Sequence, residues 1–251
     1  RGLTPTRHAL SSPAFYAERK GRKIEPLPSS STTSLSQEEL SAALTERGLP
    51  PPLSSFAATA SDAAKVAREI GFPVVLKIVS PDILHKTEAG GVHTGLTSEA
   101  DVERAAQQIF MSVRQHAPEA MITGFMVQEQ AMGVELLLGL RQDPLYGPML
   151  TMGAGGIFVE LMKDVAHTLL PVTESEISSF LQKLRITKLL EGWRGAAGAD
   201  VPALARAICD LSRFYLEHRD GIGDLEINPL IVMPAGRGLR AVDIRITPSE
   251  S

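Results

Sequence analysis

The stretch 72–96 reads Phe-Pro-Val-Val-Leu-Lys-Ile-Val-Ser-Pro-Asp-Ile-Leu-His-Lys-Thr-Glu-Ala-Gly-Gly-Val-His-Thr-Gly-Leu. Its β-branched run 74–79 predicts a strand, and the Gly-Gly pair predicts a hairpin after it. Within that strand Lys77 shares one face with Val75 and Val79. A lysine among aliphatic residues needs an anion or a route to water, and phosphate is a suitable anion. A lysine that reaches solvent from an edge strand is the alternative.

The loop after this strand carries a second set of candidate residues. Gly90 and Gly91 allow the backbone to approach a ligand closely and to point N–H groups at phosphate oxygens. His85 and Lys86 precede them. An imidazole nitrogen is nucleophilic near neutral pH, so His85 could accept and donate phosphate. A plain hairpin with a surface histidine is the alternative.

A third candidate group lies near the C-terminal end. Glu226 and Asn228 are two residues apart and therefore point to one face of a predicted strand. A turn centred near Gly236 would bring Asn228 opposite residues around Asp243 or Ile244. Oxygen ligands of this kind suit Mg²⁺ shared with phosphates. A solvated polar face is the alternative.

Two further segments carry weaker signals. The segment 127–135 contains Gln128, Glu129 and Glu135 and could offer backbone groups to adenine and a carboxylate to ribose, although an ordinary hairpin explains it equally well. The glycine-rich run 152–160 indicates either a backbone that closes on a ligand or a tight turn.

The remaining pattern predicts an α+β fold, because helices are segregated and most strands are joined by hairpins. A capping box at Ser36 and Glu39 opens the first helix, and a second such pair, Thr173 and Glu176, opens a later one. The other expected helices span 61–70, 98–115 and 202–218, and the other expected strands span 127–130, 134–140, 149–152, 165–170, 224–233 and 239–246. Fingerprints of Rossmann, Walker, zinc-cluster or nucleophile-elbow sites are absent from the sequence.

Composition narrows the function classes. The 251 residues carry a formal net charge of −4, which argues against a nucleic-acid surface. No apolar run approaches the roughly 20 residues of a membrane helix. The single cysteine, Cys209, excludes an internal disulfide, fits a reducing, cytoplasmic compartment and is expected to be buried. Residues 1–34 are basic and Pro/Ser-rich, which predicts a flexible tail or linker. The start at Arg1 suggests a subunit or a fragment of a longer protein.

Four segments together resemble one known family, the ATP-grasp domain of the NDP-forming acyl-CoA synthetases. The resemblance is to the β-subunit type found in ADP-forming acetyl-CoA synthetase, and distantly to the succinyl-CoA synthetase β chain. It covers about 35–247 and rests on Ser-Pro-Asp-Ile-Leu-His-Lys with a following Gly-Gly-Val, on Glu-Ile-Asn-Pro-Leu, and on the segments 153–165 and 189–195.

The resemblance implies an ATP-grasp fold of two α+β subdomains, roughly 35–125 and 126–247, with the nucleotide between them. It implies ATP or ADP and Mg²⁺ as cofactors, with CoA on a partner portion. The implied nucleotide-binding residues are Lys77, Lys86, Gly90, Gly91, Gln128, Glu129 and Glu135, and the implied metal ligands are Glu226, Asn228 and Asp243. His85 would relay phosphate, with Lys77 assisting as a catalytic residue.

The implied partner is a CoA-binding α subunit or domain that carries a phosphohistidine, so a hetero-oligomer is expected. The implied reaction exchanges phosphate with Mg-ADP, coupled to acyl-CoA thioester formation or cleavage. One departure stands out: Thr168 lies where the family often has an arginine, and His167 precedes it. A regulatory or vestigial module of an acetyltransferase fusion, or another ATP-grasp carboxylate ligase, are the alternatives.

Overall fold

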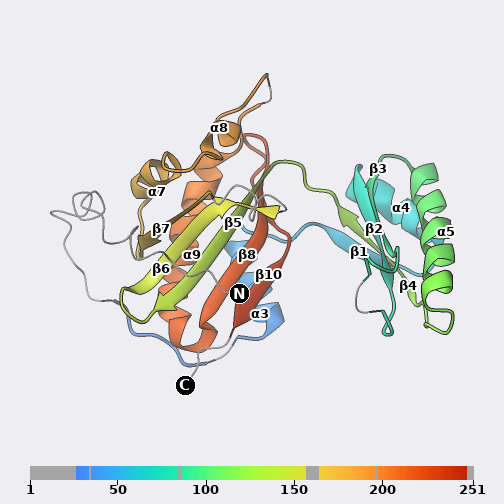
Figure 1. Cartoon of the computed structure of the whole chain (residues 1–251), viewed down its shortest axis with the longest axis horizontal. Coiled ribbons are helices and arrows are strands. Elements are labelled where there is room, and N and C mark those ends of the chain that lie inside the picture. The colour runs from blue at the N-terminus through green and yellow to red at the C-terminus, as the bar shows by residue number, and fades with distance from the viewer. Residues whose placement is uncertain (1–26, 34, 84–85, 157–163, 196, 248–251) are drawn as a thin grey trace. The chain divides into compact units, whose positions relative to one another are not determined.

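The computed structural model describes residues 27–33, 35–83, 86–156, 164–195 and 197–247, which form two compact units (Figure 1). One unit is Pro52–Ala131, and the other joins the chain up to Pro51 with the chain from Met132 onward. The predicted subdomain range 35–125 therefore needs correction. Leu40 and Leu44 pack into the core of the discontinuous unit, so the first helix belongs there.

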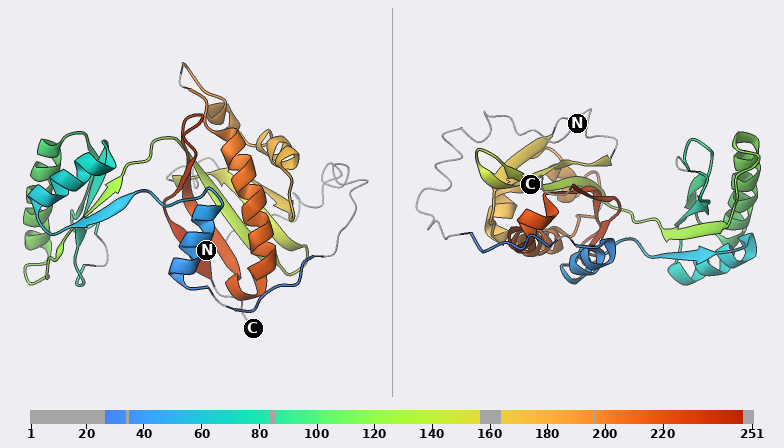
Figure 2. Two further views of the ribbon diagram at one scale, coloured as in Figure 1. Left: turned by 180° about the vertical axis from the view of Figure 1, so that it is seen from behind. Right: turned by 90° about the horizontal axis from the view of Figure 1, so that it is seen from below.

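The unit Pro52–Ala131 is a four-stranded antiparallel sheet with helices on one face (Figure 2). Val74, Leu76 and Ile78 are fully buried and pack with residues of both helices, which confirms the predicted alternation around Lys77. The strands in spatial order are β1 (Ser54–Ala57), β4 (Gly124–Glu129), β2 (Val74–Val79) and β3 (Val92–Leu96), and the helices are α4 (Ala60–Ile70) and α5 (Glu99–His116).

The discontinuous unit is built on a six-stranded antiparallel sheet. The predicted single strand 239–246 is divided into two short strands, both paired with the same neighbour in one continuous register. The spatial order is β10 (Ile244–Thr247), β8 (Asp224–Val232), β5 (Val134–Asp143), β6 (Gly147–Ala154) and β7 (Val165–Leu169), with β9 (Leu239–Ala241) also paired to β8.

One long helix covers one face of this sheet (Figure 2, left). It is α9 (Val201–Ile222), and the predicted apolar stripe of Leu204, Ile208, Leu211 and Tyr215 is buried in the core. Cys209 is buried on the same helix, as expected, and burial raises the pKa of its thiol to about 11. The other helices of the unit are α3 (Gln37–Glu46), α7 (Glu174–Leu181) and α8 (Thr187–Leu190).

The capping boxes predicted for the first turns of α3 and α7 are both formed. In α3 the Ser36 hydroxyl accepts from the Glu39 N–H at 3.2 Å, and the Glu39 carboxylate accepts from the Ser36 N–H at 2.8 Å. The sequence did not predict β1 or α8, because each is only four residues long.

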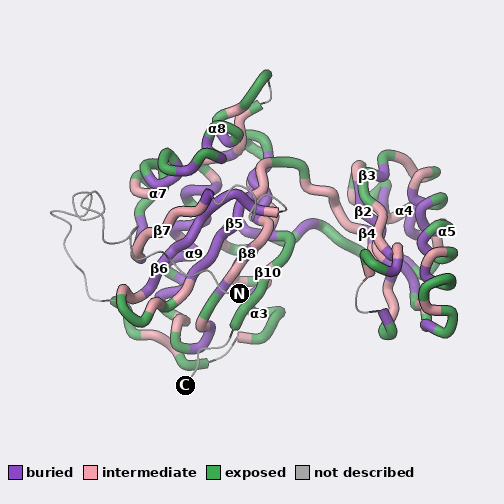
Figure 3. Tube along the Cα trace, viewed as in Figure 1, coloured by how far each residue is buried: buried purple, intermediate pink, exposed green. Residues whose placement is uncertain are grey.

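The described part of the predicted flexible tail packs on the C-terminal end of α9. The Ser31 N–H donates to the Glu217 carbonyl at 2.8 Å, and the Ser30 hydroxyl accepts from the Asp220 N–H at 3.0 Å. The interpretation of residues 27–33 as a free linker is therefore wrong, and 1–26 lie outside the described residues. Figure 3 shows how burial concentrates along the central strands. In the described parts of the chain, no helix has the length and apolar character needed to span a bilayer.

Candidate functional site

A polar row crosses one face of the six-stranded sheet. Residues directly opposite one another on antiparallel strands share a face. The row runs from β10 to β7 through Arg245, Glu226, Gly139, Thr151 and His167. The adjacent row contains Ile227, Leu138, Met152 and Ala166, and all four pack in or against the core that includes α9. The sheet therefore presents its polar residues on the face away from α9.

The predicted pairing of Asn228 with Asp243 is present. The Asn228 N–H donates to the Asp243 carbonyl at 2.9 Å, so the two residues are directly opposite. Asn228 and Glu226 are half-buried, whereas the Asp243 side chain is 50% exposed and lies 3.1 Å from the Arg245 guanidinium. Within the described ranges, no group of three or more His, Cys, Asp or Glu could hold a metal ion.

Glu135 lies close to Gly156, which contacts Asn228, and the sequence did not predict this proximity. The Gly156 N–H donates to Asn228 Oδ1 at 3.1 Å, and a Cβ at Gly156 would collide with the Glu135 carboxylate. The Gly155 N–H donates to the Glu135 carbonyl at 2.8 Å. The glycine-rich run after β6 thus brings Glu135 next to Asn228. These glycines were the available sequence signal, but their partner could not be identified from local pattern.

Lys77 and Gln128 meet on the helix-free face of the other unit. Lys77 Nζ donates to Gln128 Oε1 at 2.6 Å, and Gln128 lies opposite Val75, which shares the face of Lys77. Glu129 follows on β4 and contacts Leu53, the residue before β1: its N–H donates to the Leu53 carbonyl at 2.7 Å, and its carboxylate accepts from the Leu53 N–H at 3.1 Å. Lys77 and Gln128 thus form one polar pair, and the carboxylate of Glu129 is engaged elsewhere.

The loop before β3 is closed by its own backbone. The Gly91 N–H donates to the Lys86 carbonyl at 2.7 Å, and the Gly90 N–H donates to the Thr87 carbonyl at 3.1 Å. Gly90 has a φ of +68°, and a Cβ on Gly91 would collide with Ile78. The glycines therefore close the turn in this structure, and both of their N–H groups donate within it. His85 lies outside the described residues.

Thr168 and His167 occupy opposite faces of β7. Thr168 is paired with the core residue Leu150, so it lies on the α9 side of the sheet. His167 lies on the polar face, where its Nδ1 is 2.9 Å from the hydroxyl of Thr151. Burial lowers the pKa of the His167 imidazole, and the Arg141 guanidinium lowers it further. Thr168, which stands where the family often has an arginine, therefore does not lie on the polar face, whereas His167 does.

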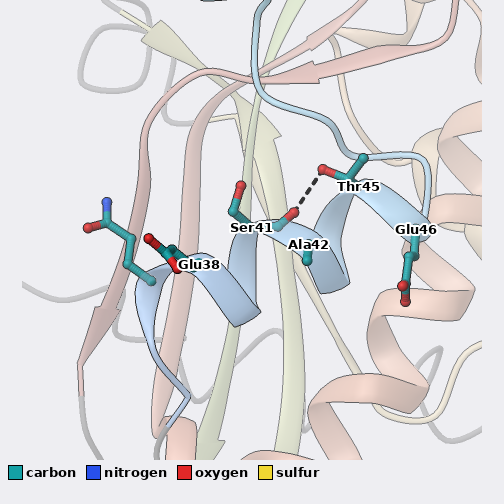
Figure 4. A pocket seen from close by; sticks show the side chains of 6 residues that line it. Glu38, Ser41, Ala42, Thr45 and Glu46 are labelled. Atoms are coloured by element: carbon teal, nitrogen blue, oxygen red, sulfur yellow. Dashed lines mark hydrogen bonds between the residues drawn. The ribbon is translucent and has the colours of Figure 1, made fainter.

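Two surface hollows adjoin α3. One of about 500 Å³ lies between α3 and β10 and includes Asp243 in its lining. The other, of about 700 Å³, is lined among the described residues by α3 alone, and the acidic side chains of Glu38 and Glu46 are part of its lining (Figure 4). The Thr45 hydroxyl in this second hollow donates to the Ser41 carbonyl at 2.8 Å, and none of the predicted site residues lines it.

Comparison with known proteins identifies one family model and several related ADP-forming CoA ligases. Residues 27–247 match the family model described as the ATP-grasp domain. The chain is 38% identical over 229 residues to the ADP-forming 4-hydroxybutyrate–CoA ligase of Nitrosopumilus maritimus, covering 90% of this chain and 33% of that protein. It is 33% identical over 224 residues to the β subunit of acetate–CoA ligase (ADP-forming) II of Pyrococcus furiosus, covering 89% and 95%.

Solved structures agree with the sequence relatives. An acetyl-coenzyme A synthetase from Korarchaeum cryptofilum, crystallised with coenzyme A and Ca-AMPCP, is 37% identical, with a TM-score of 0.67 and coverage of 94% of this chain and 97% of that chain. The α+β fold and the ATP-grasp resemblance expected from the sequence are both confirmed. The chain spans about a third of the ligase from Nitrosopumilus maritimus and nearly all of the Pyrococcus furiosus β subunit.

Proposed function

Because the chain belongs to the ATP-grasp domain family, we propose that it is the nucleotide-binding component of an ADP-forming acyl-CoA synthetase. The observation that carries the proposal is its match to 95% of a β subunit of such an enzyme. In a related structure from Korarchaeum cryptofilum, 34% identical with a TM-score of 0.64, a phosphohistidine segment points towards the nucleotide-binding site in the presence of Mg-AMPPCP.

The proposed metal ligands are oxygen donors on the polar sheet face. Glu226, Asn228 and Asp243 would bind Mg²⁺, which prefers carboxylate and carbonyl oxygens and retains several waters. The contact between Gly156 and Asn228, with Glu135 beside it, supports this choice, because it gathers a further carboxylate at the amide oxygen. When bound, Mg²⁺ would neutralise charge on the nucleotide phosphates.

The other unit would supply phosphate and base contacts. Lys77 would place its ammonium on a phosphate, because Lys77 and Gln128 lie together on the helix-free face of this unit and a phosphate oxygen accepts strong hydrogen bonds from an ammonium. Gln128 and Glu129 would flank the adenine, and Glu135 would lie near the ribose or the metal. Lys86 and the turn at Gly90 and Gly91 would adjoin the phosphates.

His85 would relay the phosphoryl group. In the direction of ATP synthesis, the N–P bond of a phosphohistidine on the CoA-binding partner breaks as an N–P bond to His85 forms. That bond breaks in turn as the terminal oxygen of ADP forms an O–P bond. The partner would hold CoA and the acyl group, making the assembly a hetero-oligomer. The buried, single cysteine fits a cytoplasmic location.

The test uses the chain with Mg-ADP and with a phosphorylated CoA-binding α subunit. Calorimetry should detect Mg-ADP binding, and acid-labile phosphate should appear on the wild-type chain but be lost in His85→Ala. His93→Ala is the matched control, because His93 follows His85 by eight residues in the sequence, lies on β3 and has no proposed role. Absence of both binding and phosphate transfer would rule the proposal out.

No described feature favours the two alternatives. The regulatory module was motivated by Thr168 in place of arginine, but Thr168 lies on the α9 side of the sheet. A carboxylate ligase acting through an acyl phosphate would yield a hydroxamate when the chain alone is given a carboxylate, Mg-ATP and hydroxylamine. We expect no hydroxamate.

A further inference from the structure

We propose that His167 is a phosphate-binding residue of the nucleotide site, oriented by Thr151. The inference rests on the proposed function and names a contact that the sequence motifs did not include. His167 ends the polar row that contains Glu226, one of the proposed metal ligands, and it reaches that face from β7, the edge strand.

Glu226 and His167 lie on different strands of this row, with Gly139 and Thr151 between them. Three strand spacings of about 4.8 Å separate Glu226 from His167, which is about 14 Å between backbones. Side chains from both ends shorten this gap, and Gly139 in the row adds no side chain. In this proposal, a polyphosphate held by the metal at Glu226 would extend along the row towards His167.

Thr151 fixes the orientation of the ring. Its side chain is fully buried, and its hydroxyl lies 2.9 Å from His167 Nδ1. A hydroxyl can donate or accept, so this contact is retained whether the imidazole is neutral or protonated. Nε2 is then the ring nitrogen turned away from Thr151. With Nδ1 accepting from the hydroxyl, Nε2 carries the proton and can donate to an anion.

The surrounding charges favour an anion as the ligand. Arg141 on β5 acts on His167 electrostatically and lowers its pKa, and Asp143 lies 3.8 Å from Arg141. The sequence of β6, between these strands, contains no ionisable side chain. A phosphate beside His167 would oppose both the burial and the arginine effect, so it should raise the pKa of the imidazole.

The experiment measures the histidine ring signals of the chain by ¹H–¹³C NMR as a function of pH. The titration is carried out on the free chain, with Mg-ADP, and with inorganic phosphate. His167→Asn assigns the signal, and His93 provides an internal reference in the same spectra. Mg-ADP should raise the pKa of His167 by about one unit and leave His93 unchanged. Thr151→Val should reduce the shift, because the ring is no longer held.

Calorimetry on the same variants separates binding from folding. His167→Asn should weaken Mg-ADP binding about tenfold, with an unchanged melting temperature and an unchanged affinity for adenosine. His167→Gln, which can place an N–H donor near the position of Nε2, should restore part of the affinity. If the wild type binds Mg-ADP while the His167 signal and the His167→Asn affinity stay unchanged, the inference is wrong and the proposed function stands. If the wild type binds no Mg-ADP, both are wrong.

Discussion

Asn228 and Gly156 are joined by a hydrogen bond from the glycine N–H to the asparagine side-chain oxygen, 3.1 Å long. Because a Cβ at Gly156 would collide with Glu135, the glycine allows a carboxylate and an amide oxygen to approach each other. This contact links the glycine-rich run after β6 to the Glu-Ile-Asn-Pro segment of β8, two motifs that are 72 residues apart.

Gly156→Ala should weaken Mg-ADP binding, because the new methyl group would displace Glu135 from Asn228. The positive φ of +60° adds backbone strain of about 1 kcal/mol or more. Calorimetry with Mg-ADP measures the affinity, and urea unfolding measures the free energy. Gly147→Ala is the matched control, because Gly147 has a φ of +82° and no atom within 4 Å of an added Cβ. Equal Mg-ADP affinities in the two variants would contradict the proposed role of this contact.

Asp243→Asn should raise the Mg²⁺ concentration needed for half-maximal ADP binding by about tenfold or more. The substitution keeps the shape of the side chain but removes the charge that attracts the cation. Titration with Mg²⁺ at fixed ADP measures the effect. Asp210→Asn is the control, since the Asp210 side chain on α9 is 47% exposed and is paired with Arg213. A variant with wild-type Mg²⁺ dependence would exclude Asp243 as a ligand.

Lys77→Met should reduce Mg-ADP affinity by at least about tenfold, because hydrogen bonds to charged groups contribute about 1.5–3 kcal/mol. Methionine is unbranched and apolar, so the strand should be retained. The control is Lys65→Met on α4, where the lysine is exposed and pairs with Asp62 at 3.2 Å. Similar affinities for the two variants would show that Lys77 is structural and does not contact phosphate.

Asp200→Asn should destabilise the discontinuous unit by about 1–2 kcal/mol. Asp200 is 8% exposed and accepts from the Ala203 N–H at 3.2 Å and the Gly238 N–H at 3.0 Å, which connects the start of α9 to the β8–β9 turn. Urea unfolding measures the loss. Asp220→Asn, an exposed site on the same helix, should leave the unfolding free energy unchanged. A stability equal to that of the control would refute this role.

Local pattern predicted most helices and strands and several exact contacts. Spacings of a few residues predicted the Ser36–Glu39 capping box and the burial of Leu76 on the face away from Lys77. The turn near Gly236 predicted the pairing of Asn228 with Asp243. The subdomain boundary was not predictable in the same way. The helix α3 could pack on either unit, and only its burial with Leu204 and Leu211 assigns it.

The sequence by itself determined the periodicities, because which face a side chain takes depends on the geometry of neighbouring peptide units. It thus placed Lys77 away from the core and Glu226 on the side of Asn228. Only the tertiary structure decided the strand order, in which β5 lies between β8 and β6, and β6 lies between β5 and β7. Pairing between distant strands depends on which apolar faces pack together and not on local spacing. That order is what places His167 in one row with Glu226.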